Sequence, residues 1–363
     1  MQGFYPSNLP RQYQGIIPYA YGNQNPTLTA TPGVEGQLFL QLPQGELFRK
    51  LDNGETTNWE ILNLEGSASS LYVVSEFGPY LSIQEAVNQA VSDGHINNNN
   101  PAVIIVCPKN GFYEEVVNVF PGIHVQGVNE TINYAVKVRG GFIFTGSYSG
   151  DNFVDNASVT NIFIQDNIAG DECIEYSTIT PTTFVLDKIT IRKTTTNSTA
   201  MLLNASNGNL IASNIFIDSN QNNINIEILQ GGFTNPFSFS VITGGARAIR
   251  KTGPDQALFL GLTINYDRDD AAILIEQGIL IFGLGGITNN NAGLNASAIF
   301  VNNGAILSFN NGTLIVADNG LNKAISGQAG GIFSYLLTVF ATSNNRVESA
   351  LTSLLQNSTP NFV

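Results

Sequence analysis

The chain has 363 residues, of which 12% are charged, and its formal net charge at pH 7 is −13. This acidic balance excludes a basic face of the kind that binds nucleic acid. The 36 Gly and 44 Asn residues favour turns over helix interiors, so the composition predicts a turn-rich all-β protein. The first residues show no basic segment followed by an apolar one, and no apolar stretch reaches about 18 residues. We therefore expect no signal peptide and no membrane insertion.

Residues 1–32 contain one charged side chain, Arg11, among many Pro, Gln, Asn, Gly and Tyr residues. The segment shows neither strand nor helix periodicity, so it cannot form a core of its own. Apolar residues such as Phe4, Ile16 and Ile17 are unusual in a flexible tail. We expect an extended N-terminal arm, which either docks on a partner or remains a loose leader.

Residues 33–70 have the pattern of a small β-hairpin module. Apolar residues recur over 37–42 and 46–51, an Asn-Gly turn ends at Gly54, and Trp59 follows. The series Gln-Leu-Phe, Glu-Leu-Phe-Arg-Lys, Asn-Gly and Thr-Thr-Asn-Trp resembles short modules that recur in phage tail-fibre and other virion proteins. This resemblance is confined to the module and implies an attachment role.

A short helix is predicted near residues 82–93. Ser82 and Glu85 form a capping box, in which each side chain bonds the backbone N–H of the other residue. Gly94 supplies a C-terminal stop. Apolar residues recur with helical spacing on one face, at Ile83, Ala86, Val87, Ala90 and Val91. We expect this helix to cap the structure that follows it.

Short apolar strands recur in three columns beyond residue 160, with steps of 22–28 residues in the first two. The first column comprises Ile162/Ile164, Ile189/Ile191, Ile215/Ile217, Phe239/Val241, Leu262/Ile264, Ile287, Leu314/Val316 and Leu337/Val339. The second comprises Ile174, Leu202, Ile226, Ala248, Ile273, Ile299 and Ile325. The third includes Leu210, Leu258, Leu280, Ile306 and Ile332.

A repeat of about 25 residues with three short strands cannot close on itself, because each strand has too few neighbours within its own unit. If the units coil in one direction, each strand pairs in parallel with its counterpart about 4.8 Å away, and alternate side chains enter a shared interior. Asn and Gly then occupy corners that need left-handed backbone. The sequence predicts an all-β, right-handed, single-stranded parallel β-helix over residues 71–341, with three strands per rung and a C-terminal cap or tail over 342–363.

The start of this region resembles a known family. The motifs Ser-Ile-Gln-Glu-Ala-Val at 82–87, Val-Ile-Ile-Val at 103–106, Tyr-Glu-Glu-Val at 113–116 and Gly-Ile-His-Val-Gln-Gly at 122–127 are similar to the N-terminal portion of pectin-lyase-like β-helix proteins. That superfamily includes polysaccharide lyases, glycoside hydrolases, pectin esterases, phage tailspikes and non-enzymatic virion proteins. The resemblance therefore implies the fold without fixing an activity.

Catalytic signatures of this superfamily are hard to find in the chain. The two histidines, His95 and His124, do not lie in a Gly-His-Gly motif. Pectate-lyase-like chemistry needs carboxylates that hold Ca²⁺ and an Arg that acts as a base. The weak candidates are Asp267, Arg268, Asp269 and Asp270, which directly follow a predicted strand. Capping of a turn is the simpler interpretation of this cluster, and we expect no cofactor and no bound metal.

Other polar and sulfur-containing residues are interpreted as structural. Asp166, Asp218, Asp267 and Asp318 each follow a strand of the first column, so they are expected to stack along one edge of the solenoid. Arg247, Arg250 and Lys251 are interpreted as solvated loop charge. Cys107 follows the apolar run that begins at residue 101, where a thiol behaves as a small buried apolar group.

Together these features favour a structural virion protein, such as a fibre, spike or capsid- or tail-associated β-helix protein, that mediates assembly or host attachment without catalysis. Residues 1–70 are expected to contact other virion proteins, and β-helices of this kind often form homotrimers along their axis. The alternative is a glycan-binding or polysaccharide-degrading tailspike, a lyase or glycoside hydrolase with a groove lined by Tyr and by corner acids such as Asp267 and Asp270. A bacterial surface adhesin is a weaker third hypothesis.

Overall fold

The computed structural model describes the chain from residue 19 onward. This description has gaps at residues 34, 36, 42–45, 62–70, 96–99, 129–135, 146–154, 167–171, 178–181, 197, 221, 237–238, 267–269, 284, 290–296, 310–312, 318–322, 329–331, 336–338, 343–351, 357–360 and 363. The first 18 residues of the predicted N-terminal arm lie outside the described residues.

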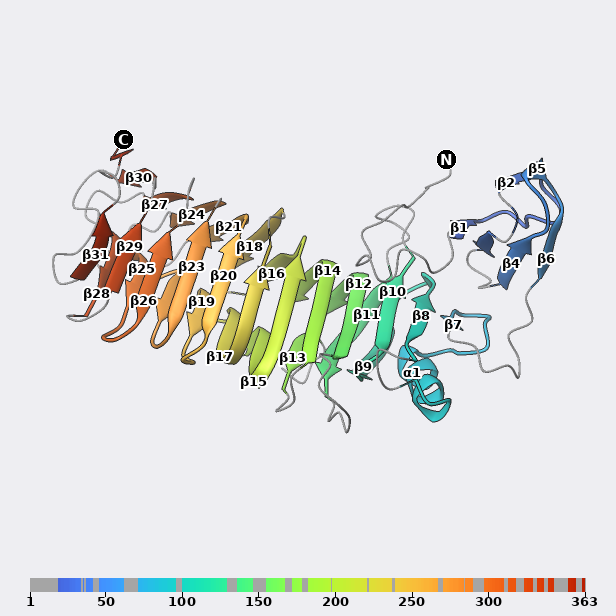
Figure 1. Ribbon diagram of the computed structural model, residues 1–363, viewed down its shortest axis with the longest axis horizontal. Helices are drawn as coiled ribbons and strands as arrows, with labels where there is room; N and C mark the ends of the chain where they lie inside the picture. The colour runs from blue at the N-terminus through green and yellow to red at the C-terminus, as the bar shows by residue number, and fades with distance from the viewer. Residues whose placement is uncertain are drawn as a thin grey trace.

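A small β module forms the first part of the described chain (Figure 1). Its two sheets consist of β1 (Tyr19–Gly22), β3 (Leu38–Gln41), β4 (Glu46–Lys50) and β6 (Trp59–Ile61), and of β2 (Thr31–Gly33) with β5 (Gly54–Thr56). Phe39, Phe48 and Trp59 form its core. The predicted hairpin is confirmed as the antiparallel pair β3–β4. Strands β1 and β2 extend the module upstream of the boundary predicted at residue 33.

Strand β3 packs on the outside of the first turns of a solenoid. Its residues Leu38 and Leu40 share a buried apolar cluster with Ile105 of β8 (Ala102–Val106) and with Cys107. The other alternate residues of β8 belong to the interior core, so Ile105 and Cys107 face outward beneath the module. The module and the solenoid therefore contact each other through this buried apolar cluster.

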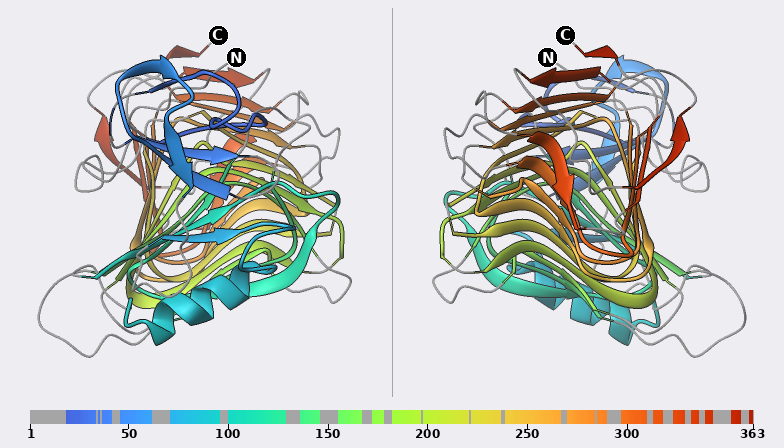
Figure 2. Two further views of the ribbon diagram at one scale, coloured as in Figure 1. Left: turned by 90° about the vertical axis from the view of Figure 1, so that its right-hand side faces the viewer. Right: turned by 90° about the vertical axis from the view of Figure 1, so that its left-hand side faces the viewer.

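The remainder of the described chain is a parallel β-solenoid with about 25 residues per rung, which confirms the predicted fold class (Figures 1 and 2). Its strands pair in three parallel ladders, here named A, B and C. Ladder A comprises β7 (Leu71–Val74), β8, β10 (Ile123–Gly127), the first parts of β12 (Asp155–Gln165) and β14 (Thr182–Lys193), the last parts of β15 (Thr199–Ser213) and β17 (Ile224–Asn235), then β20 (Gln256–Leu260), β23 (Ile279–Gly283), β26 (Ile306–Phe309), β29 (Ile332–Tyr335) and β31 (Thr352–Gln356).

The other two ladders complete each rung. Ladder B comprises the first parts of β9 (Tyr113–Val119) and β11 (Lys137–Phe144), the last parts of β12 and β14, then β16 (Phe216–Ser219), β18 (Ser240–Gly244), β21 (Leu262–Tyr266), β24 (Gly285–Asn289), β27 (Thr313–Ala317), β30 (Val339–Thr342) and β32 (Asn361–Phe362). Ladder C comprises the last parts of β9 and β11, β13 (Ile174–Tyr176), the first parts of β15 and β17, then β19 (Arg247–Lys251), β22 (Ile273–Ile275), β25 (Ser297–Val301) and β28 (Lys323–Gly327).

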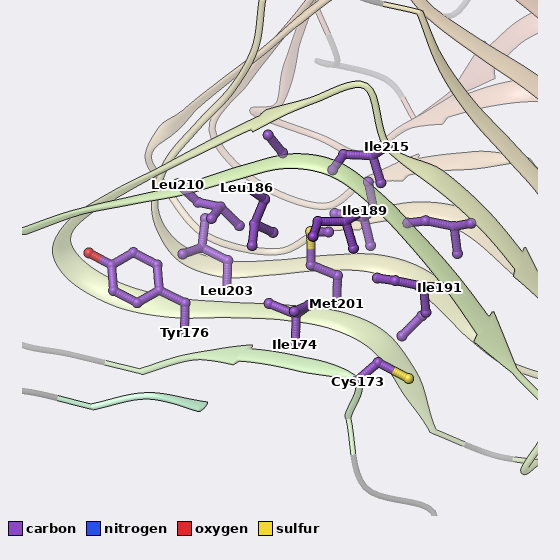
Figure 3. Packing of buried hydrophobic residues seen from close by; sticks show 14 of the residues in the cluster. Cys173, Ile174, Tyr176, Leu186, Ile189, Ile191, Met201, Leu203, Leu210 and Ile215 are labelled. Carbon is purple, nitrogen blue, oxygen red and sulfur yellow. The ribbon is translucent and has the colours of Figure 1, made fainter. Parts of the chain in front are cut away.

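Stacks of equivalent apolar side chains fill the interior of the solenoid (Figure 3). One inward position of ladder B is isoleucine on successive rungs, at Ile164, Ile191, Ile217, Ile242, Ile264 and Ile287. The corresponding position of ladder C holds Ile174, Met201, Ile226, Ile249, Ile273, Ile299 and Ile325. Burial of each such side chain contributes roughly 1.5–3 kcal/mol, so the stacks are a main source of stability.

The predicted apolar columns coincide with the ladders of the solenoid. At several rungs, however, the residue that faces inward is one position away from the predicted one. Met201 and Ile249 occupy the inward positions of ladder C that were assigned to Leu202 and Ala248. In ladder B the inward residue is Ile242 instead of Val241, and Phe239 is 96% exposed. The register also places Ile315 beside Ile287 where Leu314 and Val316 had been predicted.

Left-handed backbone recurs at the corner between ladders A and B. Asn161, Lys188 and Asn214 occupy equivalent positions on successive rungs, with φ values of 61°, 54° and 52°. Asparagine adopts this conformation more readily than most other residues that carry a Cβ. The Nδ2 of Asn161 donates to the Gly127 carbonyl, and that of Asn214 donates to Asp187. The predicted use of left-handed corners is confirmed here, with lysine as an exception.

The N-terminal end of the solenoid is covered by α1 (Ile83–Ser92), which confirms the predicted helix (Figures 1 and 2). Its apolar face belongs to the interior core. Ser82 Oγ accepts from the Glu85 backbone N–H at 3.1 Å, but the Glu85 carboxylate accepts from Leu81 instead of Ser82. The first two N–H groups of the helix donate to the Glu115 carboxylate of β9, at 2.8 Å each. The cap is thereby fixed to the first rungs.

At the other end, parallel pairing continues beyond the boundary predicted at residue 341. Strand β31 pairs with β29 of ladder A, and β32 pairs with β30 of ladder B. The C-terminal segment predicted as a cap or tail therefore contributes strands of its own to the solenoid. Within the described residues, no helix is long and apolar enough to cross a membrane.

Candidate functional site

Only the last residue of the acidic cluster predicted after β21, Asp270, is among the described residues. Asp267, Arg268 and Asp269 lie outside the described residues. Asp270 occupies a corner, where its Oδ1 accepts from the backbone N–H of the next residue at 2.7 Å. Its Oδ2 forms an ion pair with Arg247, and 63% of the Asp270 side chain is exposed. This geometry is that of a corner cap that is tied to the preceding rung.

A connected group of charged side chains lies on the outer face of ladder C. Arg250 of β19 lies between Glu227 of β17 and Glu276, which follows β22. Its Nη1 is 3.2 Å from Glu227 Oε1, and its Nε is 2.9 Å from Glu276 Oε1. The hydrogen bond to Glu276 is the main cause that raises the pKa of Arg250. Thr199 of β15 donates to the second oxygen of Glu227 at 3.0 Å.

These contacts join four successive rungs of ladder C by side chains alone. Both oxygens of Glu227 are occupied, and the Glu276 carboxylate is held by the Arg250 guanidinium. Ion pairs and hydrogen bonds to neighbouring rungs hold both carboxylates in place on the surface of ladder C. The arrangement is therefore suited to bracing the rungs, and networks of this kind contribute more than isolated surface ion pairs.

A buried ion pair lies inside the corner between ladders B and C. Asp166 follows β12 and Lys193 ends β14; their Oδ2 and Nζ are 3.6 Å apart, and neither side chain is exposed. Thr194 and Thr195 donate to the carboxylate from backbone N–H and hydroxyl groups. Burial acts to raise the pKa of Asp166, but these hydrogen bonds outweigh it and the pKa is lowered. This carboxylate has all of its oxygens bonded within the fold.

Of the four acids predicted to stack roughly along one edge, the two that are described lie at the same end of ladder B, two rungs apart, but point to opposite faces. Asp218 is in register with Arg192 and lies on the outer side, where the two side chains are 3.9 Å apart. Asp166 occupies the position one residue later, which points inward. Asp267 and Asp318 lie outside the described residues. No row of equivalent carboxylates therefore forms between Asp166 and Asp218.

Lys251 was interpreted as solvated charge, and this is wrong. It ends β19 with its side chain directed inward and fully buried, and its Nζ donates to the Gly253 carbonyl at 2.6 Å. Burial lowers the pKa of Lys251 to about 8. Because Arg250 and Lys251 are neighbours in a strand, they point to opposite faces, which explains why one is a surface brace and the other is buried.

The two histidines lie in different parts of the first rungs. His124 of β10 is buried, its Nδ1 is 2.9 Å from Ser158 Oγ, and burial lowers its pKa to about 4. His95 follows α1, with its Nδ1 3.1 Å from the Asn100 carbonyl and its ring 5.9 Å from the ring of Tyr72. The His124 imidazole is therefore neutral at pH 7, and both rings are engaged in local structure.

Metal ligands and tyrosines are arranged as follows in the part of the chain that is described. There, no group of three or more His, Cys, Asp or Glu residues converges as ligands would. Tyr113, Tyr176 and Tyr266 are at most 2% exposed and fill the interior. These three tyrosines therefore do not line an outer groove of the kind that the glycan hypothesis needs.

Sequence reasoning missed the polar residues that tie successive rungs together. Glu227 and Arg250 are 23 positions apart and of opposite charge, a spacing equal to one rung. Lys193 and Asp166 are 27 positions apart and also one rung apart. Opposite charges that are separated by one repeat length are the sequence signal that would have identified both pairs. No family model matches the chain, and no curated protein or solved structure matches it.

Proposed function

We propose that the chain is a structural component of a virus particle, a fibre, spike or capsid- or tail-associated β-helix protein that acts in assembly or host attachment without catalysing a reaction. One observation carries this proposal: the small module is packed on the outside of the first solenoid turns through Leu38 and Leu40. A compact module fixed at the start of an elongated solenoid suits a part that anchors at one end and projects or braces at the other (Figure 1).

The build of the solenoid supports a mechanical role. Its three ladders give each described rung backbone hydrogen bonds to its neighbours, and its interior is filled by stacked apolar side chains. Side-chain braces such as Glu227–Arg250–Glu276 add contacts across rungs on the surface. Because close-packed interiors have low compressibility, the solenoid is suited to transmitting force along its axis.

The proposed attachment surface is the module within residues 1–70. Leu28 and Leu51 are 80% and 41% exposed on it. When a partner covers exposed aliphatic side chains, the free energy of binding becomes more favourable by about 25 cal/mol per Å² of apolar area that is buried. Other virion proteins are the proposed partners of this surface, and the particle is the proposed location of the chain.

The test uses particles whose genome encodes the chain, prepared without it, and the purified full chain added back. We expect the wild-type chain to co-sediment with the particles. We expect the double variant Leu28→Asp/Leu51→Asp to remain in the supernatant, because two charges are placed on the attachment surface. Phe239→Asp is the matched control: Phe239 is 96% exposed, but it lies on the solenoid, so binding should be unchanged. Absence of the wild-type chain from the particle fraction would overturn the proposal.

A further inference from the structure

The outer face of ladder A is covered at the start of the solenoid and half-open farther along. Val103 of β8, His124, Ser158 and Val185 are equivalent outward positions on four successive strands. Leu38 of the module packs at the Val103 end, and His124 is buried although it points outward. From Ser158 onward this line of positions is half-buried. The cover of the face therefore ends after its first strands.

The half-open part of the face is largely aliphatic. Its outward residues in register are Val185, Ile211, Thr234, Leu258 and Ile281, which we define as the aliphatic row. Leu260, Ile279 and Ile306 widen the row on neighbouring strands. From Val103 to Ile281 the register passes through seven strand spacings, which at about 4.8 Å each extend for about 34 Å along the axis.

Apolar side chains alone do not distinguish ladder A from ladder B. Phe163, Thr190, Phe216 and Val241 are in register on the outer face of ladder B, and 41% of Phe216 is exposed. The module, however, packs against the outer face of ladder A, through residues such as Leu38. The distinction between the two faces therefore lies in what is attached beside them.

The N-terminal arm joins the described chain beside the covered end of ladder A. Tyr19 is the first described residue, and it pairs with Leu38 where β1 runs along β3. Leu38 itself packs on the outer face of the first solenoid strands. Residues 1–18 therefore begin next to the face that the aliphatic row continues.

The arm has the length and the composition to cover the aliphatic row. Eighteen residues span up to about 60 Å when extended, well beyond the row. Their apolar side chains include Phe4, Ile16 and Ile17, and Arg11 is the one charged side chain. Among the described outward residues of ladder A from β12 to β23, Asp187 is the one that is charged. An apolar segment with one base thus matches an apolar face with one acid.

We infer that residues 1–18 dock along the aliphatic row of their own chain. Covering the row contributes about 25 cal/mol per Å² of apolar area that is buried. Because the arm is tethered at Tyr19, its effective concentration at the row is on the order of millimolar, and a separate partner has to compete with it. This inference goes beyond the proposed function and does not depend on it.

The test uses trypsin cleavage after Arg11, since no other lysine or arginine occurs before Arg49. Mass spectrometry follows the release of residues 1–11 from the full chain under native conditions. A synthetic peptide of residues 1–18 gives the cleavage rate of an arm that is not docked. We expect the full chain to be cleaved about 10-fold or more slowly than the peptide, because cleavage follows the population of the open form. This protection should be the same at about 1 μM and at about 50 μM chain, since the arm binds its own molecule.

Two valines provide a matched pair of substitutions. Val185 on ladder A and Val241 on ladder B are both half-buried and point outward. Val185→Asp should bring cleavage after Arg11 to within about threefold of the peptide rate, because an apolar segment cannot cover a carboxylate without a cost in free energy. Val241→Asp should stay as protected as the wild type. Circular dichroism checks that both variants fold.

Three results would overturn the inference. The first is cleavage of the wild-type chain at the peptide rate. The second is protection that is lost on dilution, which would assign the arm to another copy of the chain. The third is cleavage in folded Val185→Asp that is no faster than in Val241→Asp. If Val185→Asp does not fold, Val185→Thr and Val241→Thr replace the pair, because threonine keeps the shape of valine. Cleavage should then be about threefold faster in Val185→Thr alone, and equal rates contradict the inference.

Discussion

Leu40 of the module and Cys107 of the solenoid lie in one buried apolar cluster, and neither side chain is exposed. The second thiol, Cys173, is buried in the interior of the solenoid. Burial raises the pKa of both thiols to about 12, so neither reacts while it remains covered. The two cysteines therefore report separately on release of the module and on opening of the solenoid.

We expect Leu40→Ala to expose Cys107 without exposing Cys173. Loss of a buried leucine side chain costs about 2–5 kcal/mol, and here that cost falls on the contact between module and solenoid. The measurement is the labelling rate of each thiol under native conditions, with peptide mass spectrometry to assign it. Leu28→Ala, at a residue that is 80% exposed, is the control and should leave both rates unchanged. Equal acceleration of both thiols would show that the module and the solenoid open as one unit.

A pair of neighbouring residues on β18 tests the register of ladder B. Ile242 is inward and 1% exposed, whereas Val241 points outward. We expect Ile242→Ala to lower the free energy of unfolding by about 2–5 kcal/mol, because it leaves a cavity in the isoleucine stack. Val241→Ala should lower it by less than about 1 kcal/mol. Urea unfolding of both variants measures this, and a larger loss for Val241→Ala would contradict the register.

Lys188 is the strained member of the corner column formed with Asn161 and Asn214. Its φ of 54° is a conformation that is unfavourable for a long side chain. We expect Lys188→Asn to raise the free energy of unfolding by about 0.5–1 kcal/mol. Asn214→Ala, at the equivalent position one rung later, should lower the unfolding midpoint, since alanine cannot form the hydrogen bond to Asp187 on the preceding rung. A loss of stability in Lys188→Asn would show that lysine contributes more at this corner than its backbone costs.

Because Lys251 is buried, we expect the free energy of unfolding to rise at alkaline pH. Its pKa is about 8 in the folded chain, below the usual value of 10.5. Between these two values the unfolded chain binds more protons, so the free energy of unfolding increases with pH by about 1 kcal/mol per unit. Below pH 8 this contribution is lost. Urea unfolding from pH 7 to 10.5 should show the rise in the wild type, and Lys251→Met should remove it; the same slope in both proteins would contradict a buried neutral lysine.

The architecture could be predicted from the sequence because a repeat near 25 residues leaves stacking as the only way to bury three short strands. The exact register could not be predicted at every rung. At Leu202 the preceding residue is Met201, and at Ala248 the next residue is Ile249, so both members of each pair are apolar. Alternation then fails to distinguish the inward residue, and a slip of one position reverses the faces.

The polar residues of the candidate site were harder to predict than the core. Lys251 points into the interior because of the register of its strand, and this register cannot be derived from the composition. The buried pair of Asp166 and Lys193 depends on a corner that brings residues of successive rungs together. Strand β1, which lies before the boundary predicted at residue 33, pairs in parallel with β3, and hairpin patterns do not reveal such a contact.

The most direct test of the proposed role is quantitative mass spectrometry of gradient-purified particles whose genome encodes the chain. We expect a fixed number of copies per particle that is retained after a high-salt wash, because the proposed attachment surface on the module is apolar. Recovery of the chain only in the soluble fraction, with no peptides at the particle density, would contradict this expectation.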